Sequence, residues 1–298
     1  SRRDVLVAAG QIESHVADMT ATIAADVPLE TVQAHLAQFN QWIPIDGDAR
    51  LPIGQLIETN STGPLRLGYG AWRDLLLGCQ FKTTDGQLIT VGGRTMKNVA
   101  GYDVVKLMVG QRGILGSLVT VTCRTYARPE AALMAEFAPS DTWLGSVITT
   151  PLRPRWAILR AAALVCGWMD DEQAISLFEH LAREQNSRRI QRRSVAEDIE
   201  DRRHLWKVEG DHFRAAVGPG KIFAFAEQAK VMNWVADAAF GIVIGPYANG
   251  QEAAIENAAE NCGGSAAFFA ADQVPRWKMN PVEQTILERL KRAFVSDG

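Results

Sequence analysis

The sequence predicts an α+β fold in two domains, on three observations. The chain has 298 residues, enough for one large or two medium domains. Period-two stretches dominate the first 128 residues, whereas residues 130–275 alternate between strand and helix patterns. The hydrophobic fraction of 47% is ordinary for a globular protein with a sizeable core.

The composition argues against several function classes. A net charge of −3 gives no overall bias toward nucleic acid or an anionic membrane. The longest apolar stretch, residues 157–167, contains Arg160 and is too short to cross a bilayer. The cysteines lie far apart with no CxxC pair, so we expect reduced, mostly buried thiols and no metal site. They are Cys79, Cys123, Cys166 and Cys262.

The first elements are expected in the order strand, strand, helix. Residues 4–9 and 20–25 are apolar runs typical of short strands, and residues 28–39 have apolar side chains at helical spacing. A turn-rich connection follows over residues 42–48. Small and polar residues crowd residues 52–69, which predicts a loop. Such a loop either offers N–H and hydroxyl groups to an anion or heterocycle, or is plain surface.

A hairpin is predicted next, with strands over residues 75–84 and 87–91 and Asp85-Gly86 as a type I′ turn signal. Two glycine-rich loops separated by an amphipathic turn follow. The stretch then ends in a strand from Val119 to Tyr126, whose alternating faces predict half-burial. The glycines of these loops indicate main chain brought close to another group; they are Gly92, Gly93, Gly101, Gly110, Gly113 and Gly116.

In the second half, strands and helices alternate. Strands are predicted over residues 157–165, 213–217, 221–226 and 241–244, and helices over residues 170–185, 251–261 and 287–294. This order favours a small antiparallel sheet with helices on one side.

Residues 51–130 resemble the second half of an FAD-binding domain of the PCMH, or vanillyl-alcohol oxidase, type. The run MKNVAGYDVVKLMVGQRGILG is especially similar to FAD-binding subunits of glycolate oxidases. No P-loop and no GxGxxG motif opening a helix is present, so a Rossmann nucleotide site is not expected. The resemblance implies an FAD-binding domain over residues 1–129 and a smaller α/β cap domain with an antiparallel sheet over residues 130–275. It also implies a C-terminal helix, residues 276–298, that returns to the first domain.

The resemblance further implies which residues bind FAD. One set matches the flavin-contacting loop of the family: Pro44, Asp46, Gly54, Thr59, Asn60, Ser61, Gly63 and Pro64. The other lies around a glycine-rich loop and the strand after it: Gly113, Gly116, Ser117 and Val119. No catalytic residue is implied.

This chain departs from the family pattern at two positions. Gln55 replaces a glycine, and therefore places a side chain where backbone normally approaches the flavin. Glu58 replaces an alanine and would bring a carboxylate near the diphosphate unless it points away. The glycine-rich pyrophosphate loop that opens the family's first subdomain is not found in this sequence, so either the chain is trimmed or this member has lost part of its flavin cradle.

The second half offers few candidates for catalysis. A basic run, Arg188, Arg189, Arg192 and Arg193, precedes an acidic run, Glu197, Asp198, Glu200 and Asp201. This pattern is either a docking patch or anion site, or a solvated polar loop or helix with ion pairs within the helix. The histidines stand alone in sequence: His15, His35, His180, His204 and His212. His204 and His212 lie where a cap domain could face a flavin.

The resemblance implies an FAD-binding subunit of a glycolate-oxidase-like complex, which positions the flavin or transfers electrons. A second flavoprotein subunit would oxidise a small 2-hydroxy acid, and an iron–sulfur subunit would take the electrons. Two alternatives are a self-sufficient flavin oxidoreductase and a scaffold that has lost FAD. We expect no nucleic-acid partner, no transmembrane segment and a cytoplasmic location, with membrane attachment through partners as the alternative.

Overall fold

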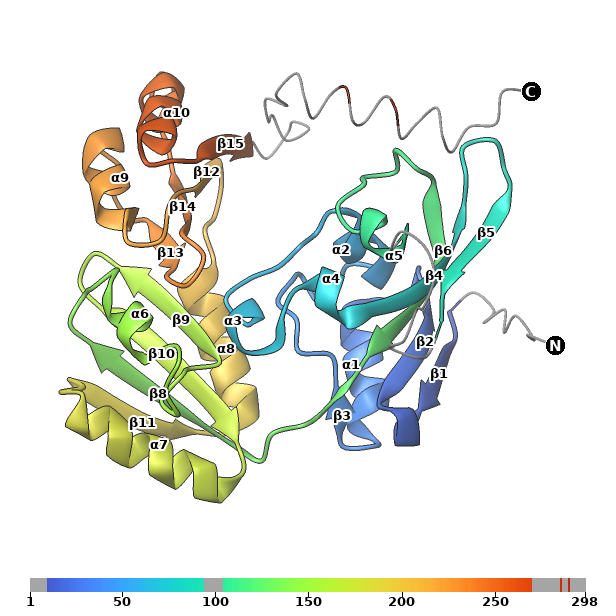
Figure 1. The fold of residues 1–298 in the computed structure, drawn as a ribbon, viewed down its shortest axis with the longest axis horizontal. Coiled ribbons are helices and arrows are strands. Elements are labelled where there is room, and N and C mark those ends of the chain that lie inside the picture. Colours follow the sequence, from blue (N-terminus) through green and yellow to red (C-terminus); the bar gives the residue numbers. More distant parts are fainter. Residues whose placement is uncertain (1–9, 94–103, 270–284, 286–288, 290–298) are drawn as a thin grey trace. The chain divides into compact units, whose positions relative to one another are not determined.

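The computed structural model describes residues 10–93, 104–269, 285 and 289 (Figure 1). The described chain divides into two compact units. The first contains the residues up to Arg128 together with Thr285 and Arg289, and the second contains the residues from Pro129 to Phe269. Three sequence predictions fall outside the described residues. They are the strand over 4–9, the position of Gly101, and the C-terminal helix over 287–294 apart from Arg289.

The first unit is built on a five-stranded antiparallel sheet with the order β1-β2-β6-β4-β5. Its strands are β1 (Ile12–His15), β2 (Thr20–Ala24), β4 (Leu76–Lys82), β5 (Leu88–Gly92) and β6 (Ser117–Arg124). A separate pair joins β3 (Gln41–Trp42) to β7 (Tyr126–Ala127). The helices are η1 (Val16–Asp18), α1 (Leu29–Ala37), α2 (Ile53–Glu58), α3 (Arg66–Tyr69), α4 (Trp72–Leu75) and α5 (Val104–Leu107).

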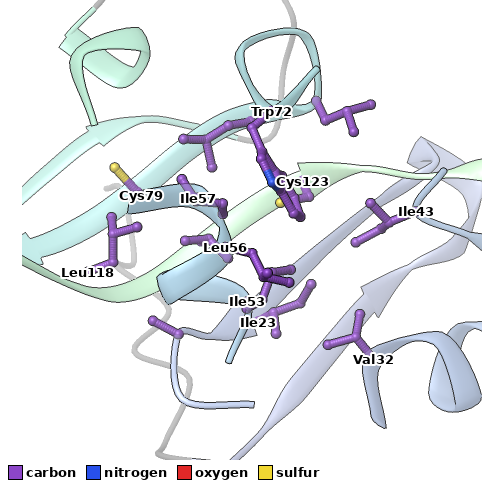
Figure 2. Close-up of a cluster of buried hydrophobic side chains, with 14 of the residues drawn as sticks. Ile23, Val32, Ile43, Ile53, Leu56, Ile57, Trp72, Cys79, Leu118 and Cys123 are labelled. Atoms are coloured by element: carbon purple, nitrogen blue, oxygen red, sulfur yellow. The ribbon is translucent and has the colours of Figure 1, made fainter. Parts of the chain in front are cut away.

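One apolar core fixes α1 and α2 in the first unit (Figure 2). Val32 of α1, Ile53 of α2 and Ile23 of β2 are fully buried in it, as is Trp72 of α4. Each such side chain contributes about 1.5–3 kcal/mol when it leaves water. The predicted strand over 20–25 and helix over 28–39 are confirmed by β2 and α1.

The predicted loop over residues 52–69 is wrong, because it contains α2 and α3. Ile53, Leu56 and Ile57 are buried at helical spacing, and this burial outweighs the polar composition that follows. Pro52, at φ −55° and ψ 140°, directly precedes the first residue of α2. At the start of a helix the backbone N–H has no partner within the helix, so proline, which lacks this N–H, is tolerated there.

The predicted hairpin is confirmed by the antiparallel pair of β4 and β5, but its turn is not type I′. A type I′ turn needs two residues with positive φ, and only Gly86, at φ 91°, has one here. The Thr83 N–H donates to the Gln87 oxygen, and the Gly86 N–H donates to the Thr83 oxygen. The connection is therefore a three-residue turn ending in a left-handed glycine, and the Thr83 hydroxyl stabilises it by donating to Asp85.

Strand β6 differs from the predicted half-buried strand, because both of its faces are largely covered. It lies in the middle of the sheet, between β2 and β4. Thr120 and Thr122, on the face expected to be solvated, are buried. The Thr122 and Thr22 hydroxyl oxygens lie 3.1 Å apart, and the Thr120 hydroxyl donates to Gln80. These hydrogen bonds inside the sheet thus replace the ones that the threonine hydroxyls would form with water.

The second unit is an eight-stranded antiparallel sheet with the order β11-β8-β10-β9-β13-β14-β12-β15. Its first half is β8 (Ala131–Phe137), α6 (Trp143–Val147), β9 (Trp156–Arg160), β10 (Leu164–Asp170), α7 (Glu172–Glu184) and β11 (Arg189–Arg193). Its second half is β12 (His212–Ala216), α9 (Ile222–Ala229), β13 (Val235–Asp237), β14 (Ile242–Pro246), α10 (Glu252–Asn261) and β15 (Ser265–Phe269). Helix α8 (Val195–Trp206) connects them.

The two halves are repeats of one βαββαβ unit. In each half the fourth strand lies beside the first, and the third lies between the first and the second, as in ferredoxin-like folds. The repeats join through their second strands, β9 and β13. The sheet is therefore larger than the small one predicted.

Helices cover both faces of this sheet, not one face as predicted. Trp168 of β10 stacks on Phe178 of α7, whereas the neighbouring Gly167 faces the opposite side, where Trp156 donates to Asp198 of α8. Two sequence predictions in this unit are wrong. Residues 157–165 belong to two strands, β9 and β10, and residues 221–226 lie mostly in α9.

The other predicted elements of the second unit are confirmed. Helices α7 and α10 and strands β12 and β14 lie where they were expected. The basic run forms edge strand β11, and its arginines form ion pairs: Arg192 with Glu172 and Glu179, and Arg193 with Asp201. The run is therefore a strand and not the predicted polar loop or helix, and its ion pairs are made with α7 and α8 instead of within one helix. Within the described residues, no helix has both the length and the apolar character that crossing a membrane requires.

Candidate functional site

The candidate site begins at the C-terminal end of α2. Asn60 has a left-handed backbone, at φ 51°. The Ser61 N–H donates to the Leu56 oxygen at 2.8 Å, and the Asn60 N–H donates to the Ile57 oxygen at 3.0 Å. Together these bonds form a Schellman cap, in which asparagine replaces the usual glycine. The hydroxyl of Thr59 donates to a carbonyl of the last turn, so this side chain completes the cap.

The second predicted segment is bonded directly to this cap. The Gly110 N–H donates to the Ile57 oxygen, and the Arg112 N–H donates to the Glu58 oxygen, each at 3.0 Å. A Cβ on Gly110 would lie 3.3 Å from the Cβ of Asn60. The loop thus satisfies helix carbonyls that have no partner inside α2. The structure brings together two sets of residues that are about 50 positions apart in sequence.

The loop over residues 110–117 is held from inside by a buried glutamine. The side chain of Gln111 donates to the Gly116 oxygen at 2.8 Å and accepts from the Leu115 N–H at 2.9 Å. Arg112 and Gly113 are exposed and left-handed, at φ 55° and 77°, and no atom lies within 4 Å of a Cβ on Gly113. Sequence reasoning missed Gln111 and Arg112, although both lie between glycines.

Two of the predicted glycines contact the protein itself. A Cβ on Gly54 would lie 2.7 Å from the Cβ of Ala25, and one on Gly63 would lie 2.7 Å from the Cβ of Asp46. Asp46 also accepts a hydrogen bond from the Leu65 N–H at 2.7 Å, so it fixes the chain after Gly63. The sequence predicts that the main chain at these glycines approaches another group closely, and in the structure that group is another part of the protein's own chain. The other members of the first set, Pro44 and Pro64, are buried.

The start of β6 carries the rest of the second set. Gly116 has φ 130°, and a Cβ there would lie 2.2 Å from the Lys82 oxygen, so only glycine fits. Ser117 is exposed, whereas the Val119 oxygen accepts from the Ala25 N–H at 2.9 Å. Of these residues, Ser117 is therefore the one that solvent reaches most readily.

Glu58 points into the protein. Its Oε1 accepts a hydrogen bond from the Leu118 N–H at 2.8 Å. Burial raises the pKa of Glu58, and the bond from Leu118 partly opposes that shift. The carboxylate is therefore directed at β6. Gln55, the other departure from the family pattern, is exposed on α2.

The exposed groups of this region fit a nucleotide cofactor. Asn60 and Ser117 offer amide and hydroxyl groups, and the left-handed backbone at Gly113 leaves open space.

The two histidines considered for catalysis have local partners. His204 lies 3.0 Å from Glu200 one turn away on α8. His212 stacks on Phe269, with ring centroids 5.1 Å apart, and its Nδ1 lies 3.0 Å from the Gly210 oxygen. His204 therefore pairs with a carboxylate on the exposed surface of α8, and His212 contacts an aromatic ring and a main-chain oxygen.

The cysteines are free and buried, as the sequence predicts. Burial raises the pKa of Cys79 and of Cys123 to about 12 and also raises that of Cys166, so these thiols are unreactive. In the described part of the chain, no three His, Cys, Asp or Glu residues are grouped so that they could hold a metal ion.

Residues 4–106 match the family described as the FAD binding domain. The match confirms the resemblance to PCMH-type FAD-binding domains and identifies FAD as the cofactor. It covers the first set of predicted FAD contacts and ends before Gly113, where the second set begins.

The chain is related to glycolate oxidase subunits. It is 33% identical over 133 residues to glycolate oxidase subunit GlcE of Escherichia coli, and the aligned residues make up 44% of this chain and 38% of that protein. It is 38% identical over 78 residues to glycolate oxidase subunit GlcD of Bacillus subtilis, and the aligned residues make up 26% of this chain and 17% of that protein. The chain thus spans less than half the length of these relatives.

A solved structure of alkyldihydroxyacetonephosphate synthase has the same fold as this chain. The two superpose with a TM-score of 0.67 over 95% of this chain and 63% of the synthase chain, at 12% sequence identity. At that identity the likeness concerns the fold alone, and it confirms the predicted α+β class.

Proposed function

We propose that this chain is the FAD-binding subunit of a glycolate-oxidase-like complex that oxidises 2-hydroxy acids. In this complex it positions the flavin or transfers electrons, and it does not oxidise the substrate itself. One observation carries the proposal: an FAD binding domain in which the α2 cap and the loop over residues 110–117 are bonded to each other. The similarity to GlcE supports it. Bound FAD supplies the redox chemistry, and the protein supplies binding and orientation.

In this proposal the two predicted sets of residues bind FAD in different ways. Exposed groups at Asn60, Gly113 and Ser117 contact the cofactor. Gly54 and Gly63 act indirectly, because their contacts with the protein's own chain fix the backbone around the site. The remaining members contribute shape: Pro44, Asp46, Thr59, Ser61, Pro64, Gly116 and Val119.

The proposed partners are a second flavoprotein subunit and an iron–sulfur subunit. An iron–sulfur cluster needs grouped thiolates, whereas the cysteines here are dispersed and buried, so the cluster would be held by a partner. The histidines of the second unit have local partners, which favours oxidation of the small 2-hydroxy acid on the other flavoprotein subunit. We place the complex in the cytoplasm, or at the membrane through its partners.

Flavin binding by the purified full chain tests the cofactor assignment. The visible absorption of bound flavin is measured before and after incubation with FAD and removal of free cofactor. Retained flavin absorption is the expected result. A chain that takes up no FAD would contradict the proposal and leave the scaffold alternative.

The subunit role is tested separately, with the FAD-loaded chain alone. We expect no dye reduction with glycolate, because in this proposal the other flavoprotein subunit oxidises the substrate. Glycolate-dependent dye reduction by the isolated chain would favour a self-sufficient flavin oxidoreductase and would contradict the subunit role.

A further inference from the structure

Glu58, the last residue of α2, is bonded to the second segment at two points. Its main-chain oxygen accepts the Arg112 N–H at 3.0 Å, and its Oε1 accepts the Leu118 N–H at 2.8 Å. The preceding carbonyl, of Ile57, accepts the Gly110 N–H. Two consecutive residues of α2 therefore hold three backbone N–H groups of residues 110–118.

A carboxylate is a costly choice at this position. The C-terminal end of a helix carries partial negative charge, which disfavours an anionic side chain there. Half-burial disfavours the charged form further, and it raises the pKa of Glu58. A costly group that forms a specific bond indicates a role.

The position of the two bonds indicates what that role is. Between Arg112 and Leu118 lie Gly113 and Ser117, which are exposed and belong to the predicted FAD contacts. Gly113 has a positive φ and open space around it, so its neighbours restrict its backbone little. Holding both ends of this stretch against one helix residue restricts the conformations between them.

We propose that Glu58 is a positioning residue for FAD, which clamps residues 112–118 to the end of α2 and so holds Gly113 and Ser117 in place for the cofactor. The choice of ligand rests on the proposed function, whereas the clamp itself rests on the two hydrogen bonds. In the opposite role, the Glu58 carboxylate competes with FAD, because it accepts the hydrogen bond from the Leu118 N–H that the cofactor would otherwise accept. The two roles predict opposite changes in FAD affinity when the carboxylate is removed.

Three variants of the full chain separate these roles. E58Q keeps an acceptor oxygen at the same chain length, whereas E58M removes the acceptor and keeps length and helix propensity. E30M is the matched control, because Glu30 is an exposed glutamate of α1 and is not one of the predicted FAD contacts. The readouts are hydrogen–deuterium exchange of residues 112–118 without cofactor and the FAD dissociation constant from flavin fluorescence.

We expect E58M to raise amide exchange at Leu118 about 10-fold or more and to weaken FAD binding about 10-fold, since a bond to a charged acceptor is lost. E58Q and E30M should stay close to wild type in both readouts. Unchanged exchange in E58M, or FAD binding as tight as or tighter than in wild type, would overturn the inference. If wild type binds no FAD, the proposed function fails, and unchanged exchange would still overturn the clamp. Should E58M fold poorly, E58A gives the same comparison.

Discussion

At the scale of single residues, Glu58 links burial to proton binding. Its carboxylate is half-buried and faces the Leu118 N–H. Burial disfavours the charged form, so the pKa in the folded protein lies above the ordinary value of 4.5. The folded protein therefore binds more protons than the unfolded chain between the two pKa values. The contribution to stability is fully present below the unfolded pKa and is lost as pH rises through the folded pKa.

This titration gives a prediction for the E58Q variant in the absence of FAD. The amide does not titrate, so the variant does not lose stability at this position as pH rises, whereas wild type does. We expect its unfolding midpoint to gain about 2 °C on wild type between about pH 4 and about pH 7. Thermal unfolding at several pH values measures this. E30Q, at an exposed glutamate of α1, should follow wild type, and a pH-independent difference for E58Q would contradict the assignment.

Gly167 of β10 gives a second residue-scale prediction. A Cβ there would lie 2.0 Å from Cε2 of Trp156, whose indole N–H donates to Asp198 at 3.0 Å. G167A should displace the ring, weaken that bond and cost about 3 kcal/mol of unfolding free energy, measured with urea. The control is G145A, because Gly145 lies in α6 with open space around it. Alanine there should be neutral or stabilise by about 0.5–1 kcal/mol, and equal losses in both variants would refute the packing argument.

Among the elements, short apolar segments set the limit of prediction from sequence. The segment from Ile222 to Ala226 is a short, continuous apolar run, which fits a buried strand as well as a buried helix. In the structure, Ile222, Phe225, Ala226 and Ala229 are buried at helical spacing on α9. Five apolar residues show no period of their own, and α9 packs against α10 and places Phe225 beside Phe213 of β12. Longer segments with one clear period, such as α7 and α10, could be predicted.

Helix α2 was predictable in principle, whereas the contacts of its last turn were not. Ile53, Leu56 and Ile57 have helical spacing in the sequence, although the polar residues after them favoured a loop. The bond from Leu118 to Glu58 joins residues 60 positions apart, and no local pattern encodes such a pairing. The candidate FAD residues came from a family resemblance, and the structure adds which of them are exposed.

Helix α8 gives a prediction at the scale of an element, because it packs on the sheet through a buried ion pair. Asp198 and Arg202 are 1% and 3% exposed and are bonded to each other one turn apart. R202A removes the cation and leaves the carboxylate buried, which should cost about 3–5 kcal/mol in urea unfolding. R203A, at an exposed arginine paired with Glu200, should cost less than about 1 kcal/mol. A small effect of R202A would contradict the account of α8 packing.

At the scale of the whole molecule, the cysteines report on the two units separately. Cys79 and Cys123 lie in the first unit, and Cys166 and Cys262 in the second, all buried. A thiol reagent should therefore modify them only when their own unit opens, which gives two kinetic classes. We expect G167A to speed labelling of the second-unit pair about 10-fold or more and to leave the first pair unchanged. Mass spectrometry of labelled peptides measures this, and equal acceleration of all four would contradict independent opening.

The junction of the two repeats has a consequence for each repeat taken alone. Ala236 of β13 lies opposite Leu159 of β9, and this ladder makes one continuous sheet from the two repeats. A half-length fragment would therefore expose the unpaired backbone of a strand that is central in the intact chain. The most direct way to satisfy those backbone groups is for two fragments to dimerise through this strand. Two molecules would then form the continuous sheet that the intact chain forms from its two repeats.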